Sequence, residues 1–245
     1  MRTKVAISAA AVLAVGAAGM VAAVSTSADA DHSTDASRAV DPALFSHPRS
    51  NVYFPLRPGT VFRYHGTDAG RHFREVVTIT HRTKRIEGVD ARVSRDVLRR
   101  SDGSLAEKTA DWYAADSHGN VWYFGERTAT YDRHGHLQSR EGSWQTGVDG
   151  AVPGLIMPHD PRPTDAYRQE LERGSAEDQA WIVQRGFSAT VAHRTVHHLV
   201  RSLEWSRLEK GVVSVKMYGP HLGIVRERDM SGGSESFQLV SVHRP

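Results

Sequence analysis

Two carboxylates in one hairpin are the residues whose types and spacing could most readily do chemistry. Asp111 and Glu126 end a stretch centred on His118-Gly119, and they come directly opposite each other if that stretch folds as two antiparallel strands. Opposed carboxylates about 5 Å apart are typical of retaining glycosidases, in which one carboxyl needs a raised pKa to act as the acid. A purely structural pair, solvated or facing nearby arginines, is the alternative, and a register slip of one residue would separate the two carboxylates.

Histidines offer a second kind of chemistry. His134 and His136 share a strand face beside Asp132, a spacing that occurs in zinc sites, which commonly have three protein ligands. However, both histidines flank a glycine in a turn sequence, so metal binding by His134 and His136 is an alternative and we expect no metal centre. No Gly-x-Ser-x-Gly elbow and no glycine loop before a helix is present, and we expect no cofactor.

The hairpin that carries the carboxylates is aromatic on both expected faces. Simple alternation places Asp111, Tyr113, Trp122, Phe124 and Glu126 on one face, and Trp112 and Tyr123 on the other. A strand pair with one solvated face should alternate apolar with polar residues, so either both faces are covered or one lines a ligand site. The candidate lining residues are Trp112, Trp122, Phe124 and Met157; the alternative is that these aromatics are core.

Recurrent turn signals divide the chain into strands of about ten residues. Turns such as Asp68-Ala69-Gly70, Ser101-Asp102-Gly103 and Asp132-Arg133-His134-Gly135 separate runs of β-branched and aromatic residues. Between residues 147 and 163, four prolines and three glycines predict a long loop, which serves as a lid or as a crossover that plugs the core with Leu155-Ile156-Met157. The fold class predicted is all-β: a single antiparallel meander of long strands curled into a half-barrel or open barrel.

The residues at the N-terminus have the pattern of a targeting segment. Residues 1–30 combine a basic start, an apolar run and an Ala28-x-Ala30 cleavage site, which together predict a cleaved signal peptide, although the apolar run is long enough for a retained anchor. Residues 31–50 are expected to be a flexible lead-in and residues 51–245 a single β domain. The expected location is therefore secreted or extracytoplasmic, with no stable membrane span after cleavage.

Composition excludes several classes of protein. The absence of cysteine removes disulfides, thiol catalysis and a lipid-modified cysteine. The formal net charge is +3 and the basic residues are spread along the strands, so we expect no nucleic-acid partner.

Three stretches carry a family resemblance. They are the hairpin, the segment Asn51-Val52-Tyr53-Phe54-Pro55-Leu56-Arg57-Pro58-Gly59-Thr60, and Tyr218-Gly219-Pro220-His221-Leu222-Gly223-Ile224-Val225. Together they resemble an uncharacterised family of secreted, mostly actinobacterial β proteins, over residues 51 to 242. More distantly, the layout resembles the curved half-barrel of lipoprotein carriers such as LolA and LolB, which implies an apolar concavity that binds acyl chains.

The function predicted is non-catalytic binding of an apolar or amphipathic ligand, a lipid or an envelope component, outside the cytoplasmic membrane. The alternatives are a glycan-acting hydrolase that uses Asp111 and Glu126, and a structural or protein-binding envelope module with exposed edge strands.

Overall fold

The computed structural model describes residues 40–245. The predicted signal peptide, residues 1–30, and residues 31–39 of the predicted lead-in lie outside the described residues. From residue 40 onward, no helix has the length and hydropathy needed to cross a membrane.

The described chain is a run of β-strands preceded by one short 3₁₀ helix. In chain order these are η1 (Pro42–Phe45), β1 (Val61–Asp68), β2 (Arg71–Ile86), β3 (Val89–Arg100), β4 (Leu105–Ala115), β5 (Val121–Tyr131), β6 (Leu137–Ser139), β7 (Trp144–Gln145), β8 (Val152–Met157), β9 (Ala166–Arg168), β10 (Glu170–Leu171), β11 (Asp178–Val191), β12 (Arg194–Ser206), β13 (Val213–Gly219), β14 (Gly223–Ser231) and β15 (Ser236–His243).

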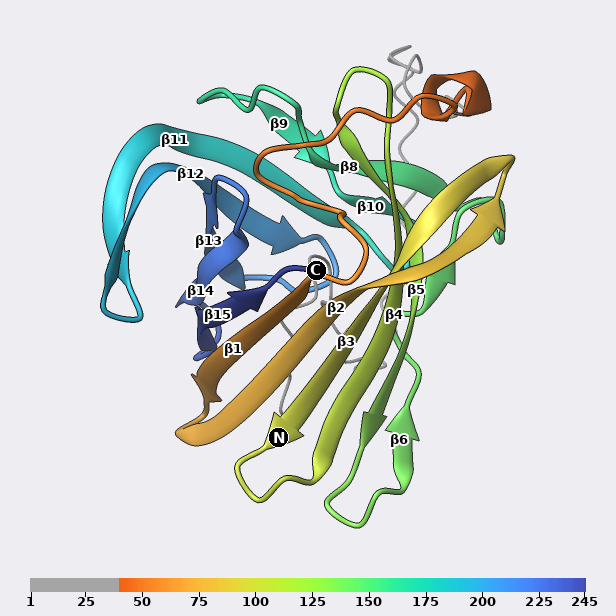
Figure 1. The fold of residues 1–245 in the computed structure, drawn as a ribbon. Coiled ribbons are helices and arrows are strands. Elements are labelled where there is room, and N and C mark those ends of the chain that lie inside the picture. The colour runs from red at the N-terminus through yellow and green to blue at the C-terminus, as the bar shows by residue number, and fades with distance from the viewer. Residues whose placement is uncertain (1–39) are drawn as a thin grey trace, which may run out of the picture.

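All of these strands belong to one antiparallel sheet that nearly closes into a barrel (Figure 1). Thirteen strands follow one path, β10-β8-β5-β4-β3-β2-β1-β15-β14-β13-β12-β11-β9, and β6 and β7 pair with β5 beside it. The first and last strands, β1 and β15, pair with each other in the middle of that path. The predicted fold class is therefore confirmed: an all-β, single antiparallel sheet curled into an open barrel.

One seam of the barrel stays unsealed by strand pairing. The path ends at β10 on one side and at β9 on the other, and only Gln169 separates these two short strands in the chain. The main-chain N–H of Gln169 donates to the carbonyl of Asp178 at 2.8 Å, at the start of β11. The chain itself thus crosses from one sheet edge to the other at the seam.

The register of β4 and β5 is partly as predicted. Asp111 does pair with Glu126, but the register then shifts, so Tyr113 pairs with Tyr123 and not with Phe124. Two residues of β5, Phe124 and Gly125, therefore face one residue of β4, which is a β-bulge. Beyond the bulge every β5 side chain changes face, so the expectation of alternation through the whole hairpin was wrong.

Gly125 makes this bulge possible. Its φ of 126° is a conformation that residues with a side chain rarely adopt, and a Cβ at this position would collide with the main-chain oxygen of Trp144 on β7.

The Pro-rich segment is more regular than its composition predicted. Residues Val152–Met157 form β8, which pairs with both β5 and β10, so a continuous loop over residues 147–163 was the wrong expectation. Pro153 lies opposite Glu170 of the two-residue β10, at the end of the sheet path, where a missing N–H costs least. Ile156 and Met157 are fully buried and close the core at this side.

Candidate groove and interior cavity

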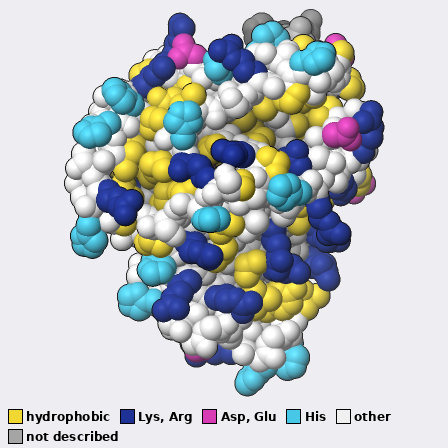
Figure 2. Space-filling model, viewed as in Figure 1, with side chains coloured by type: hydrophobic (Ala, Val, Ile, Leu, Met, Phe, Trp, Pro, Cys, Tyr) yellow, Lys and Arg dark blue, Asp and Glu magenta, His cyan; other side chains and the backbone are white. Residues whose placement is uncertain are grey.

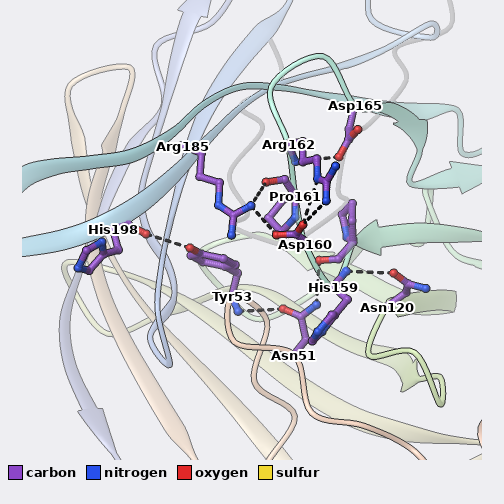
Figure 3. A network of polar contacts seen from close by, with 11 residues as sticks. Asn51, Tyr53, Asn120, His159, Asp160, Pro161, Arg162, Asp165, Arg185 and His198 are labelled. Atoms are coloured by element: carbon purple, nitrogen blue, oxygen red, sulfur yellow. Dashed lines mark hydrogen bonds and ion pairs between the residues drawn. The ribbon is translucent and has the colours of Figure 1, made fainter.

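The segment before β1 crosses one end of the barrel and is held there by hydrogen bonds from Asn51 (Figure 3). Its amide Nδ2 donates to the carbonyls of Gly119 at 2.8 Å and Pro158 at 3.0 Å, on two separate loops. Its Oδ1 accepts from the main-chain N–H groups of Tyr53 and Phe54. One buried side chain thus fixes the segment to the barrel and sets its local turn.

Further contacts fasten the same segment along its length. Tyr53 donates its hydroxyl proton to the carbonyl of His198, and the N–H of His221 donates to the carbonyl of Val52 at 2.6 Å. On the neighbouring loop Asp160 accepts from Arg162 and Arg185, and these hydrogen bonds lower the pKa of its carboxyl (Figure 3). Residues 48–57 therefore form a cover that these hydrogen bonds hold over this end of the barrel.

A groove of about 720 Å³ runs along this cover. That volume lies in the range of small-molecule sites, which is about 300–1,000 Å³. Apolar and small side chains make up most of the wall, and polar groups stand among them; the lining is Phe45, Pro48, Arg49, Ser50, Asn51, Val52, Phe54, Pro55, Leu56, Arg57, Thr60, Asp90, Arg92, Tyr113, Ala114, Ala115, His221 and Arg244.

The charge of the groove is positive. Four arginines line it against one carboxylate, Asp90, and that carboxylate is already paired with Arg85 at 2.9 Å. Arg92 and Arg244 donate to main-chain carbonyls, which orients their guanidinium groups without neutralising them. The face drawn in Figure 2 has the same character, because Lys and Arg side chains stand between hydrophobic patches and acidic side chains are few.

Beneath the groove lies a smaller cavity of about 50 Å³ inside the barrel. Phe54, Pro55 and Tyr113 line both spaces, and the rings of Phe54 and Tyr113 meet edge to face with centroids 5.0 Å apart. These rings therefore separate the groove from the cavity. The remaining walls of the cavity are Phe62, Tyr64, Val77, Ile79, Ser94, Asp96, Asp111, Gly223 and Ile224.

The cavity has two acidic walls and a third carboxyl close by. Asp96 is 4% exposed, and its Oδ1 has no hydrogen-bond partner among residues 40–245. Glu75, which is 1% exposed, lies beside Asp96, and the two side chains share a hydrogen bond. Burial raises the pKa of Asp96 to about 7, even though its contact with Glu75 lowers it, and burial followed by the charge of Asp96 raises the pKa of Glu75.

The two carboxylates singled out by their spacing are joined by a phenol. The Tyr123 hydroxyl lies 2.9 Å from Asp111 Oδ1 and 3.1 Å from Glu126 Oε2. The phenol has one proton to donate to these two acceptors, and burial, followed by the charge of Asp111, raises the pKa of Glu126 even though the hydrogen bond from Tyr123 lowers it. Both carboxyls are at most 3% exposed.

Tyr123 was missed as a partner of these carboxylates because simple alternation placed it on the other face. A glycine inside a strand pattern was the available signal, because Gly125 allows the bulge that turns Tyr123 inward.

Three of the four residues predicted to line a ligand site lie together on the outer face of the sheet. Trp112, Trp122 and Phe124 pack with η1, where Phe45 meets Phe124 edge to face at 5.5 Å. Met157 is separate from them and belongs to the inner core. None of the four lines the groove or the cavity, although Phe45 belongs to both the outer cluster and the groove wall.

The histidine pair lies on the exposed turn between β5 and β6. His136 Nδ1 is 3.0 Å from Asp132 Oδ2, and the rings of His134 and His136 are 6.1 Å apart between centroids. In the part of the chain that the structure describes, no three His, Asp or Glu side chains are grouped so that they could hold a metal ion.

On β13, one buried lysine holds two carboxylates. Lys216 Nζ lies 3.0 Å from Glu204 and 3.5 Å from Glu227. Burial lowers the pKa of Lys216, but the two carboxylates outweigh burial and the net pKa is raised. Glu204 also accepts hydrogen bonds from Ser202 and Tyr218, which extend this buried polar cluster.

No protein-family model and no curated protein matches the chain. Among solved structures, the chain is similar to a Bacteroides fragilis protein that is thought to be exported and has a YmcC-like fold, with 11% identity over 79% of this chain and 100% of that chain and a TM-score of 0.46. It is also similar to a Parabacteroides distasonis protein thought to be a lipoprotein, with 12% identity over 80% of this chain and 100% of that chain and a TM-score of 0.41.

Proposed function

We propose that this protein is a non-catalytic binding protein that works outside the cytoplasmic membrane and holds an amphipathic ligand, a lipid or an envelope component, in the groove under residues 48–57. The observation that carries the proposal is the composition of the groove: a wall of mainly apolar and small side chains with four arginines and one paired carboxylate. Such a surface suits a ligand with an apolar body and an anionic head. The signal-peptide pattern of residues 1–30 supports the location.

The energetic logic follows from the two parts of the groove. Apolar burial contributes roughly 25 cal/mol per Å² before the costs of association, and it draws the body of the ligand out of water. Charge-assisted hydrogen bonds from Arg49 and Arg92 then select an anionic head, because each is about twice as strong as a neutral hydrogen bond.

A binding series on protein purified without detergent tests the proposal. We expect dodecyl phosphate to bind saturably and more tightly than dodecanol or dodecyltrimethylammonium, by titration calorimetry below the concentration at which each forms micelles. The double variant Arg49→Gln with Arg92→Gln should lose at least about tenfold in affinity for dodecyl phosphate.

Arg74→Gln is the matched control, because Arg74 is an exposed arginine of β2 that does not line the groove. Equal binding of the three amphiphiles, or equal losses in the groove variant and the control, would refute an anion-selective groove.

A further inference from the structure

The outer face of strands β1 to β5 carries basic side chains that are far apart in the sequence. These strands lie side by side in one wall of the barrel (Figure 1). Side chains alternate across a strand, so the residues between the buried ones point outward. Each of the five strands has at least one exposed Arg or Lys at such a position, and together they form the basic face: Arg63, Arg74, Arg95, Arg99, Lys108 and Arg127.

Two arginines of the basic face are directly opposed. Arg74 on β2 pairs with Arg99 on β3, and Arg63 on β1 pairs with Val76, so Arg63 stands diagonal to Arg74. Like charges directly opposite each other destabilise a sheet, and diagonal neighbours are about 7–8 Å apart. This arrangement therefore costs the folded protein stability, and a bound anion would remove that cost.

The basic face continues without a break onto β4 and β5. Lys108 pairs with Val97 on β3, and Arg127 on β5 pairs with Ala110, so Lys108 and Arg127 are diagonal neighbours. Ala110 also pairs with Arg95, which gives this small residue a basic side chain on each side. Five strands span four strand spacings, or roughly 19 Å, so the six cations form one patch of that width.

Few carboxylates offset this charge. Of the acidic residues on the five strands only Asp90 is exposed, and Arg85 pairs with it at 2.9 Å. Within residues 40–245, none of the six side chains of the basic face forms an ion pair. The positive field also reaches a neighbouring side chain, because burial and then the charge of Arg127 lower the pKa of Lys84. The basic face is thus complementary to a partner with several negative charges.

Shape and residue type indicate which polyanion fits. The face is the outside of a barrel and is therefore convex, so a flat membrane would touch only part of it, whereas a flexible chain can follow the curve. On these five strands no large apolar side chain is exposed. Membrane-surface helices insert such side chains, and proteins that bind single-stranded nucleic acid stack bases on aromatic ones. These observations favour a polyanionic chain without bases.

The arginines favour phosphate as the anionic group. A guanidinium presents five N–H donors in a planar fork, and Arg74 and Arg99 would approach one bound group from two different strands. The oxygens of a phosphodiester are arranged tetrahedrally and can accept from both directions, whereas a carboxylate accepts mainly in its own plane.

We propose that the basic face binds a linear phosphodiester polymer that carries no bases, laid across β1 to β5. None of the six basic residues lines the groove, so this site is separate from the one in the proposed function and does not rest on it.

The probe is a fluorescein-labelled oligomer of propanediol phosphate with about ten phosphodiesters, titrated with the full mature protein by fluorescence anisotropy. We expect saturable binding that weakens steeply as NaCl is added, because basic side chains release the counterions of a polyanion. Unlabelled polyglutamate of equal charge, oligothymidylate with the same number of phosphodiesters, and phosphatidylglycerol vesicles serve as competitors, and each should compete less well than the unlabelled oligomer.

A triple variant removes half of the basic face. Arg63→Gln with Arg95→Gln and Lys108→Gln should bind the oligomer at least about tenfold more weakly. The slope of log affinity against log salt concentration should become shallower by about 2, since roughly 0.7 is lost for each phosphate contact to a single chain.

The matched control removes the same charge from the other half of the sheet path. Arg168→Gln, Arg194→Gln and Lys210→Gln change two arginines and one lysine that are exposed on β9, on β12 and in the turn before β13. This control should change the affinity less than about threefold. Equal losses in the two triple variants would show that net charge alone drives binding, and the inference would fail.

Other results overturn the inference without any variant. A wild-type protein that does not bind the oligomer excludes the site, and stronger competition by polyglutamate, oligothymidylate or vesicles assigns the basic face to a different partner. The groove and the basic face are also tested separately. The triple variant of the basic face should keep its affinity for dodecyl phosphate, and Arg49→Gln with Arg92→Gln should keep its affinity for the oligomer.

Discussion

Replacing Glu107 with glutamine should stabilise the protein progressively as pH rises. Glu107 is 4% exposed on the inner face of β4, and Thr109 and Thr128 donate hydroxyl protons to its Oε1 at 3.1 and 3.2 Å. Burial, together with the negative charges of Asp96 and Asp111, raises the pKa of Glu107 from its ordinary 4.5 to about 8. Glutamine keeps the shape and the oxygen acceptor but cannot ionise.

The sign follows from proton binding in the two states. Between pH 4.5 and about 8 the folded protein holds a proton at Glu107 that the unfolded chain has lost, so stability from this group is complete below pH 4.5 and falls until about pH 8. At about 1.4 kcal/mol for each unit of pKa, the loss is about 2 kcal/mol at pH 6 and on the order of 5 kcal/mol at pH 9.

The assay is urea unfolding of the wild type and Glu107→Gln at pH 6 and pH 9. The advantage of the variant in free energy of unfolding should grow by about 3 kcal/mol between the two pH values. Glu141→Gln, an exposed carboxylate in the turn before β7, is the control and should show no such growth. A constant difference between Glu107→Gln and the wild type would mean that Glu107 does not keep its proton in the fold, and the reasoning would be wrong.

Three further variants probe the features that shape the site. Gly125→Ala should cost on the order of 3 kcal/mol in denaturant unfolding, because φ is 126° and the Cβ would meet the Trp144 oxygen, whereas Gly70→Ala, at positive φ in open space, should cost about 1 kcal/mol. Lys216→Met should lower the free energy of unfolding by about 3–5 kcal/mol, since it leaves two carboxylates buried without their cation; a loss below 1 kcal/mol would contradict the role given to this lysine. Asn51→Ala should speed hydrogen exchange at the two main-chain amides that it caps while the amides of β3 keep their protection, and unchanged exchange would show that other contacts hold the cover.

The strands and their order could be predicted from the sequence because turn residues and strand formers act locally. Strand β4, for example, was predicted with the bounds Leu105–Ala115 that the structure has. The bulge in β5 could not be predicted in the same way, because it depends on how Gly125 meets Trp144 of β7, a strand that the turn pattern did not separate.

The acidic interior could not be predicted for a different reason. Alternation along β3 separates Val93, Arg95 and Val97 from Ser94 and Asp96, but it does not say which set faces inward. Ser94 and Asp96, the more polar set, face the interior, and this orientation is determined only when the sheet closes. The same limit explains why Trp112 and Phe124 were predicted as lining residues, whereas the structure places them on the outer face.

The pairing of β1 with β15 constrains how the molecule can assemble. Residues 69–235 separate these strands in the chain, yet Phe62 lies against Val242 and Tyr64 against Leu239. A chain that emerges N-terminus first, from a ribosome or a translocation channel, therefore presents β1 with an open hydrogen-bonding edge until nearly all of the sequence has emerged. Loop closure over this distance is slow, so the folding rate should be limited by the arrival of β15. A chaperone that covers the edge of β1 would act in this interval, before the barrel has closed.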